Sequence, residues 1–244
     1  MDQRSPFPPH RVVRSFVTRD GRLTPSQQKA LDELFPKWGL DPKLRDDRKQ
    51  EPGDGLEWHF DWAEIFGRET APVFEIGFGN GENLAEQAEK NPDKDYVGIE
   101  VYRVGVGRLL NQIEQRGLSN LRVICADAVE VLNHRVAPES LSALWLFFPD
   151  PWHKKRHHKR RIVQPAFADL VASKVTPSGI WHLATDWVPY AEHMLEVLEA
   201  HSAWENTAGP GQKVPPPDNR IETHFEKRGL RKGHEVADLV YKRL

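Results

Sequence analysis

Short apolar runs alternate with amphipathic stretches along residues 71–244. The apolar runs predict strands at residues 73–76, 96–99, 121–125, 142–148 and 180–185, and a closing strand at 236–241. Between them, apolar positions at helical spacing predict helices at residues 81–90, 103–117, 163–174 and 188–200. Because repeated strand–helix units build a mostly parallel sheet with helices on both faces, we predict an α/β fold for this part of the chain.

Residues 1–70 follow a different pattern. Thr24 and Pro25 fit the N-cap and the first position of a helix. The residue types predict a helix at 24–35, a loop at 41–55 and a short helix at 61–66. We therefore predict a partly mobile N-terminal extension, residues 1–70, followed by a single α/β domain, residues 71–244.

Composition narrows the class of protein. The 244 residues are 39% hydrophobic and 29% charged, as in a globular protein without long disorder. The single cysteine, Cys125, excludes an internal disulfide and suits a reducing compartment. No stretch approaches the roughly 20 apolar residues that span a bilayer, so we expect a cytoplasmic protein. The formal net charge is −2, so affinity for a polyanion must come from a local cluster of cations.

Acidic residues stand at or near the carboxyl ends of the predicted strands. They are Glu75, Glu100, Asp127, Asp150 and Asp186. In open α/β sheets this edge is where ligands bind. Acids at such positions also cap the following helices, which is the simpler explanation for any one of them. Their gathering on one edge favours a ligand site.

The glycine-rich turn after the first strand limits the ligand. Gly77, Gly79 and Gly81 follow that strand and open a helix, but the spacing departs from the G-x-G-x-x-G fingerprint of dinucleotide sites. Glu75 and Glu82 flank the turn and would repel a pyrophosphate. A nicotinamide or flavin cofactor is therefore disfavoured.

S-adenosylmethionine fits this turn better, because it has no phosphate and carries cationic amino and sulfonium groups. Glu75 can attract the methionine end, and Glu100 is placed to accept both ribose hydroxyls. Asp127 can receive the adenine amino group. The combination indicates a class I methyltransferase.

A rigid turn and a dense cationic run follow the fourth strand. In Phe148-Pro149-Asp150-Pro151-Trp152, the prolines stiffen the turn and present Asp150 and Trp152 in fixed directions. A flat purine can stack on such an aromatic, although core packing is an alternative role for Trp152. Residues 154–161 contain six Lys or Arg and two His. A charge run is usually a solvated face, but its place beside this turn favours contact with RNA.

These motifs resemble those of the bacterial tRNA (guanine-N7-)-methyltransferases. The matching segments are residues 75–81, 98–100, 148–164, 184–187 and 223–229. The resemblance implies a Rossmann-like class I methyltransferase fold, with a mostly parallel seven-stranded sheet. It implies S-adenosylmethionine as the methyl donor, tRNA as the partner, and 7-methylguanosine at position 46 of the variable loop as the product.

The resemblance also implies roles for single residues. Cofactor contacts are implied for Glu75, Gly77, Gly79, Gly81, Glu100, Asp127 and Asp150. Asp150 is in addition the implied catalytic residue. Contacts with the substrate guanosine are implied for Lys154, Asp186, Thr223, His224, Phe225 and Glu226. Contacts with tRNA are implied for Arg156, His157, His158, Lys159, Arg160 and Arg161.

Other functions are compatible with parts of the pattern. A methyltransferase acting on another nitrogen of RNA or protein would share the glycine turn and the Asp-Pro-aromatic turn. A non-catalytic RNA-binding subunit would keep the cationic run without needing the acids. We expect no bound metal, because His153 and His157 lack a third ligand, and no obligate protein partner. Either a monomer or a homodimer is compatible with the sequence.

Overall fold

The computed structural model describes residues 15–16, 21–43, 58–217, 220–221 and 235–244. The helices are α1 Pro25–Glu33, α2 Phe35–Trp38, α3 Trp62–Phe66, α4 Glu82–Lys90, α5 Arg103–Arg116, α6 Ala128–Arg135, α7 Pro165–Lys174 and α8 Val188–Glu199, with a 3₁₀ helix, η2, at Lys155–Arg160. The strands are β1 Val73–Ile76, β2 Tyr96–Ile99, β3 Leu121–Ile124, β4 Leu141–Phe147, β5 Val175–Thr185, β6 Trp204–Asn206 and β7 Ala237–Arg243.

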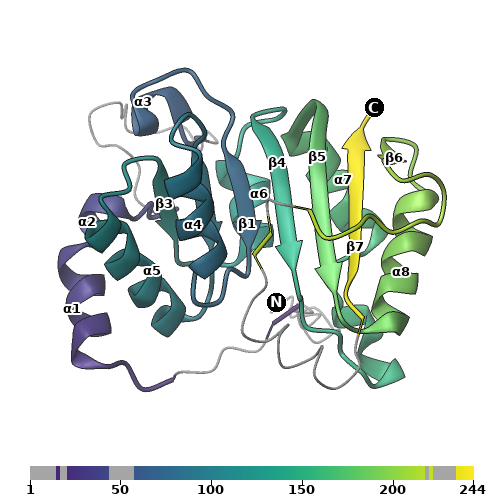
Figure 1. Cartoon of the computed structure of the whole chain (residues 1–244), viewed down its shortest axis with the longest axis horizontal. Coiled ribbons are helices and arrows are strands. Elements are labelled where there is room, and N and C mark those ends of the chain that lie inside the picture. The colour runs from purple at the N-terminus through teal and green to yellow at the C-terminus, as the bar shows by residue number, and fades with distance from the viewer. Residues whose placement is uncertain (1–14, 17–20, 44–57, 218–219, 222–234) are drawn as a thin grey trace, which may run out of the picture.

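Within the described residues, the strands form one seven-stranded sheet in the order β3-β2-β1-β4-β5-β7-β6 (Figure 1). The first five strands in this order are parallel, and β7 runs antiparallel to both β5 and β6. β1 and β2 are buried along their whole length, as expected for central parallel strands. The carboxyl ends of β1 to β5 therefore share the lower edge of the sheet in Figure 1.

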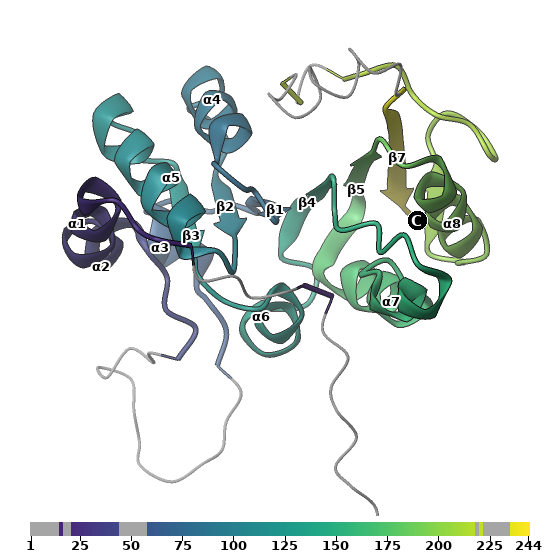
Figure 2. The ribbon, with the colours of Figure 1, turned by 90° about the horizontal axis from the view of Figure 1, so that it is seen from below.

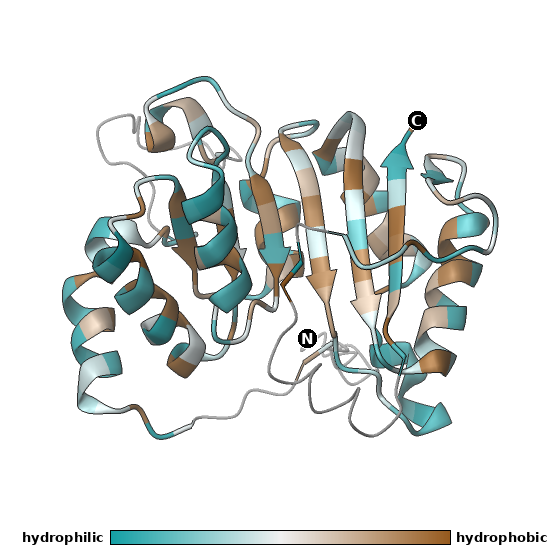
Figure 3. Ribbon diagram, viewed as in Figure 1, coloured by the Kyte–Doolittle hydropathy of each residue, from teal (hydrophilic) through white to brown (hydrophobic). Residues whose placement is uncertain are grey.

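Helices cover both faces of this sheet (Figure 2). One face packs against α1, α4 and α5 through a core that includes Leu84 and Leu109. The other face packs against α3, α6, α7 and α8 through a core that includes Phe167 and Met194. Figure 3 shows apolar bands along β1, β4 and β5, while the outer side of α4 is hydrophilic. The predicted α/β sheet with helices on both faces is confirmed.

Two helices of the predicted N-terminal extension, α1 and α2, pack beside α5 and β3 at one edge of the sheet (Figure 1). Thr24 is the N-cap of α1, as its sequence predicted, and it also forms a capping box with Gln27. α1 lies against α5, and beyond α2 the Leu40 N–H donates to the Val123 carbonyl of β3 at 2.8 Å. A division of the chain at residue 70 remains a prediction. Most of the predicted loop at 41–55 lies outside the described residues.

A chain segment crosses the front of the sheet and leads back to the start of α4. This crossing segment, residues 207–217 and 220–221, pairs first with β7 and then reaches α4 (Figure 1). The Val214 N–H donates to the Asp238 carbonyl at 3.0 Å, and the Ile221 N–H donates to the Asn83 side chain at 3.0 Å. It places residue 221, which precedes the predicted guanosine-binding residues in the chain, beside the start of α4.

Some elements differ from those that the sequence predicted. The prediction missed α6, whose only buried side chains are Ala128, Val131 and Leu132, so its apolar face is too small to stand out. It also missed α2 and β6, which are too short to show periodicity. β5 begins at Val175 rather than residue 180 because the strand continues through a polar, irregular stretch. Among the described residues, no helix has the length and apolarity needed to cross a bilayer.

Candidate active site

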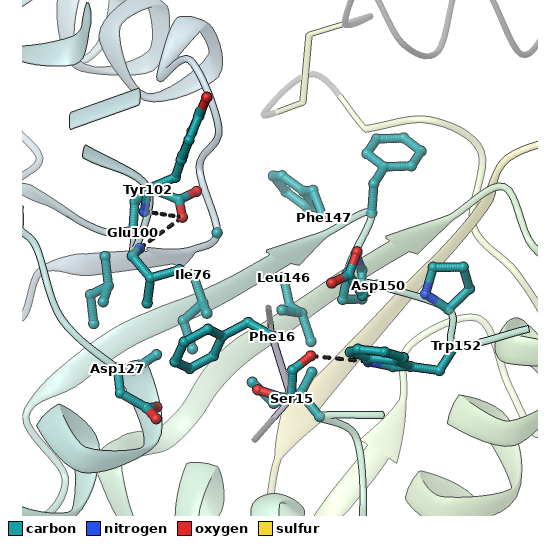
Figure 4. A pocket seen from close by; sticks show the side chains of 18 of the residues that line it. Ser15, Phe16, Ile76, Glu100, Tyr102, Asp127, Leu146, Phe147, Asp150 and Trp152 are labelled. Carbon is teal, nitrogen blue, oxygen red and sulfur yellow. Dashed lines mark hydrogen bonds between the residues drawn. The ribbon is translucent and has the colours of Figure 1, made fainter. Parts of the chain in front are cut away.

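A cleft of about 810 Å³ lies at the carboxyl ends of β1 to β4. Of the predicted cofactor residues, it is lined by Gly77, Glu100, Asp127 and Asp150. Figure 4 shows Glu100 and Asp127 on one side and Asp150 on the other, with the apolar side chains of Ile76 and Leu146 between them. The structure thus brings three acids, from the ends of β2, β3 and β4, to the surface of one cleft. A fourth acid, Glu75 of β1, is buried in the wall of that cleft.

Glu75 lies in that wall rather than on its surface. Its side chain points toward α4 and is 4% exposed, and it accepts a hydrogen bond from Asn83 Nδ2 at 3.0 Å. Burial raises the pKa of Glu75 to about 7, against the opposing effect of the Asn83 hydrogen bond, and the charge of Glu100 adds to the rise. A cationic group bound nearby would relieve this cost and draw the pKa back down.

The three glycines of the turn have separate roles. Gly77 and Gly79 have open space where a Cβ would lie, and the Gly79 N–H donates to Glu100 Oε2 at 3.0 Å. Gly81 faces inward instead, because a Cβ there would stand 2.6 Å from Leu109 Cδ1. Gly77 and Gly79 therefore leave room for a ligand, whereas Gly81 allows α4 to pack on α5.

Glu100 is held by backbone amides at the end of β2. Its carboxylate accepts hydrogen bonds from the N–H groups of Gly79, Val101 and Tyr102 at 3.0, 2.7 and 3.0 Å. Burial raises its pKa, these three bonds oppose the rise, and the charge of Asp150 adds to it. Fixed in this way, the carboxylate presents its remaining lone pairs to the cleft and suits a pair of hydroxyl groups.

Asp127 combines the two roles that its position suggested. It is the N-cap of α6 and accepts a hydrogen bond from the Val129 N–H at 3.0 Å. It also lines the cleft, opposite the Asp150 side (Figure 4). Capping one helix uses part of one carboxylate, so the other acceptor positions remain for a ligand.

The turn that carries Asp150 is bounded by two residues in the left-handed region of backbone space. Phe148 and Trp152 both have φ of 49°, which is uncommon for bulky side chains. The Phe148 N–H donates to the Ala184 carbonyl of β5 at 2.8 Å, and this fixes the start of the turn. Asp150 is exposed at the cleft between them. Such strain is typical of functional turns.

Trp152 faces the N-terminal segment and a cation in this structure. Its Nε1 donates to the Ser15 carbonyl at 3.0 Å (Figure 4), and the guanidinium of Arg160 lies 3.7 Å from its ring centroid. Arg160 also donates to the Phe16 carbonyl at 3.3 Å. One face of the indole is thus covered by Arg160, and stacking of a purine on Trp152 stays a prediction.

The cationic run divides into exposed and buried members. Lys154, Lys155, Arg156 and Lys159 are exposed along η2 and its start, while His157 and His158 are half-buried. Desolvation lowers the pKa of His157, and the surrounding cations lower it further, so this ring adds little positive charge at neutral pH. The exposed lysines and Arg156 present the positive charge of the run to solvent.

The sequence predicted that Arg161 contacts tRNA, but the structure places its side chain inside the protein. It is 3% exposed and donates to the carbonyls of Pro151 and Pro189 at 2.9 and 3.2 Å. Its guanidinium also lies over the ring of Tyr190 at 4.8 Å. These contacts tie the Asp150 turn to α8. The side chain therefore supports the turn from inside the protein.

The predicted guanosine residues are placed only in part. Lys154 lines the cleft. Asp186 follows β5, and its neighbour Trp187 makes an edge contact with His153 at 4.4 Å between ring centroids, which brings the two turns together. Thr223, His224, Phe225 and Glu226 lie outside the described residues.

Known proteins resemble this chain over most of its length. A family model described as "Putative methyltransferase" matches residues 69–239. The tRNA (guanine-N(7)-)-methyltransferase of Alkalilimnicola ehrlichii is 55% identical over 233 residues, which cover 96% of this chain and 93% of that protein. The enzyme of the same name from Halorhodospira halophila is 52% identical and covers 95% of each chain.

The chain belongs to the tRNA (guanine-N7-)-methyltransferase family.

Solved structures agree on the fold of this family member. The 16S rRNA methyltransferase KamB superposes with a TM-score of 0.55 at 15% identity, covering 75% of this chain and 92% of that one. The aminoglycoside-resistance methyltransferase NpmB1 gives a TM-score of 0.51 at 16% identity. The predicted Rossmann-like class I methyltransferase fold is thus confirmed.

The sequence did not predict several residues in and around this cleft, among them Ser15, Phe16 and Asn83. Ser15 and Phe16 line the cleft although they come from the N-terminal extension (Figure 4). Asn83 connects Glu75 to the crossing segment. The one available signal was that Asn83 is polar at a position whose helical spacing faces the sheet.

Proposed function

We propose that this protein transfers the methyl group of S-adenosylmethionine to N7 of guanine in tRNA, at position 46 of the variable loop. The observation that carries this proposal is the arrangement of one cleft, with Glu100 and Asp127 on one side and the strained Asp150 turn on the other. The exposed cations of η2 continue from that turn. The names of the relatives, at about half identity over nearly the whole chain, support the same reaction.

The residues of the cleft fit S-adenosylmethionine. Glu75 is a buried carboxylate whose raised pKa favours a cationic neighbour, and it lies behind the turn where the methionine amino group would bind. Glu100 is oriented by three amides to accept the ribose hydroxyls. Asp127 lies at the other end to accept the adenine amino group. When bound, the cofactor supplies a methyl group on a cationic sulfur.

The protein has little proton chemistry to perform. Guanine N7 has a lone pair and no proton, so the new N–C bond can form without a general base as the C–S pair returns to sulfur. The task of the site is to align these atoms and to stabilise the charge that moves onto the purine. A carboxylate about 4 Å from that charge contributes on the order of 4 kcal/mol at an effective dielectric constant near 20.

Asp150 is the residue we assign to this task. It is exposed at the cleft, and its charge is close enough to raise the pKa of Glu100. Lys154 and Asp186, in the two adjoining turns, would hold the guanosine. Thr223 to Glu226 are proposed for the same purpose on the family resemblance alone. A cytoplasmic location, and a monomeric or homodimeric state, also remain predictions.

Transfer of labelled methyl from S-adenosylmethionine to bulk tRNA, followed by digestion and mass spectrometry of the nucleosides, tests this function. We expect the label in 7-methylguanosine. Label in a nucleoside methylated on an amino nitrogen would indicate the alternative methyltransferase. Binding of tRNA without binding of S-adenosylmethionine would indicate a non-catalytic RNA-binding subunit.

A further inference from the structure

A buried cluster of three polar side chains lies next to the start of the Asp150 turn. Arg220 of the crossing segment is 6% exposed and donates to both carboxylate oxygens of Asp238, at 2.8 and 2.7 Å. Asp238, near the start of β7, also bonds to His182 Nε2 of β5 at 2.8 Å. Burial lowers the pKa of His182, against the opposing effect of Asp238, so the buried cluster holds one cation, one anion and a neutral imidazole.

The buried cluster meets the turn at two successive aromatic rings. The guanidinium of Arg220 lies 5.5 Å from the ring centroid of Phe148. The rings of His182 and Phe147 are in edge contact, with their centroids 4.7 Å apart. Phe147 ends β4 and Phe148 begins the turn, so the buried cluster packs where the strand passes into the turn.

The backbone of Phe148 needs support from its surroundings. Its φ of 49° lies in the left-handed region, which is unfavourable for a bulky side chain and persists only where neighbouring groups fix it. The Phe148 N–H donates to the Ala184 carbonyl at 2.8 Å, and the sheet register places Asp238 opposite Ala184. Asp150 follows two residues later, so the direction of its carboxylate depends on how Phe148 is held.

Stability alone does not account for a charged pair at this position. The cost of removing two charges from water offsets most of their attraction, so a buried ion pair adds little net stability over well-packed apolar side chains. Arginine can, however, hold a carboxylate with two bonds and still present the flat face of its guanidinium to an aromatic ring. Arg220 makes both kinds of contact. It therefore fixes the placement of the Phe148 ring.

We propose that Arg220 is a positioning residue for methyl transfer, which holds Phe148 and thereby directs the Asp150 carboxylate at the cleft. Asp238 and His182 orient Arg220 in turn. This inference rests on the proposed function, because it takes Asp150 as the carboxylate that stabilises the charge on the guanine.

The experiment measures how strongly the reaction depends on Asp150. The single-turnover rate of methyl transfer to a tRNA transcript is measured at saturating tRNA and S-adenosylmethionine, so changes in affinity do not contribute. The Asp150 factor is the rate with Asp150 divided by the rate with Asp150→Asn in the same background. In the otherwise unchanged protein we expect an Asp150 factor of up to about a thousand.

Arg220→Met should lower the rate with Asp150 present by about a hundredfold, the effect of a displacement of about 1 Å in a site. Because Asp150 is then misdirected, the Asp150 factor should fall to about ten, and the two changes together should cost little more than Asp150→Asn alone. A purely structural role of Arg220 would leave the Asp150 factor at the value of the unchanged protein. That result would overturn the inference.

Arg243→Met is the matched control. Arg243 ends β7 at the edge of the sheet opposite the cleft, where it pairs with Glu139 at 2.8 Å and donates to the Val175 carbonyl. This variant also removes an arginine–carboxylate pair and should lower the urea midpoint of unfolding. Its Asp150 factor should equal that of the unchanged protein. A fall as large as in Arg220→Met would mean that any loosening of the sheet has this effect, and the inference would be wrong.

A second variant covers the case in which Arg220→Met does not fold. Phe148→Leu keeps the buried cluster and an apolar side chain but removes the ring that faces the guanidinium. We expect its Asp150 factor to fall as in Arg220→Met. An Asp150 factor equal to that of the unchanged protein would contradict the positioning role of Arg220, because the role acts through this ring.

The two proposals fail separately. If the unchanged protein forms 7-methylguanosine in tRNA but Arg220→Met and Phe148→Leu keep its Asp150 factor, the positioning role of Arg220 is wrong and the function stands. If the unchanged protein forms no 7-methylguanosine, both proposals are overturned.

Discussion

The two sides of the cleft place the same kind of side chain in opposite surroundings. The donor side is the side proposed to bind the methyl donor, where Glu75 is buried and Glu100 is held by three backbone amides. Burial raises the pKa of both carboxyl groups. The acceptor side is the side proposed to bind the guanine, where Asp150 is exposed on a strained turn beside solvated cations. These surroundings support the proposal that the donor side binds a small cation and the acceptor side binds a base on a large polyanion. Burial and hydrogen bonding, rather than residue type, separate the two roles.

We expect the largest effect from a substitution on the acceptor side, measured as a loss of methyl-transfer rate. Asp150→Asn should lower the single-turnover rate of methyl transfer by up to about a thousandfold, because about 4 kcal/mol of charge stabilisation is lost. Affinity for tRNA, measured by filter binding, should stay nearly unchanged. Glu130→Gln, an exposed acid on α6, is the control and should transfer methyl at the normal rate. An unchanged rate in Asp150→Asn would remove the acceptor side from the comparison.

On the donor side, we expect the burial of Glu75 to make the free energy of unfolding depend on pH. The pKa of Glu75 is raised in the folded protein, so the unfolded chain releases this proton at lower pH than the folded protein does. Without a ligand, the free energy of unfolding should therefore decrease between about pH 4.5 and about pH 7, by on the order of 3 kcal/mol. Denaturant titrations of the unchanged protein and of Glu75→Gln, compared across this range, measure it. A constant difference between the two would contradict the assigned burial effect.

Within the cationic run, buried Arg161 and exposed Lys159 should contribute differently to stability. Because its guanidinium is buried and hydrogen-bonded, Arg161→Ala should lower the free energy of unfolding by about 2 to 3 kcal/mol. Lys159→Ala, at an exposed position, should change it by less than about 0.5 kcal/mol. Urea titrations of both variants give these values. Equal stabilities would mean that Arg161 is as solvated as its neighbour.

We expect the smallest effect from the exposed cations, as a change in tRNA affinity and in its salt dependence. This effect identifies the surface that contacts tRNA. Replacing Lys155, Arg156 and Lys159 with Ala should weaken tRNA binding and reduce the slope of log affinity against log salt by about one unit or less per cation. The pKa values on the donor side should not change. A salt slope identical to that of the unchanged protein would place the RNA surface elsewhere.

The sequence predicted those parts of the site that depend on local pattern. The strands end where apolar runs end, so the positions of Glu100, Asp127 and Asp150 at one sheet edge followed from the order of the elements. The glycine turn followed too, although only the packing of Leu109 shows that Gly81 faces inward.

The sequence could not predict contacts made between distant segments. Arg161 looks like its neighbours in the chain, and its burial depends on Pro189 and Tyr190 of α8. The bond between Asn83 and Ile221 depends on the path of the crossing segment over the sheet. The covering of Trp152 by Arg160 depends likewise on how η2 folds back over the turn.

The central claim is that this cleft methylates N7 of one guanine in tRNA. Methylation at N7 leaves a cationic ring that borohydride reduces, and aniline then cleaves the RNA strand at that nucleoside. After treatment of an unmodified tRNA transcript with the protein and S-adenosylmethionine, we predict one cut, at position 46, that is absent with Asp150→Asn. Incorporation of labelled methyl without a cut, or cuts at other guanines, would contradict the account.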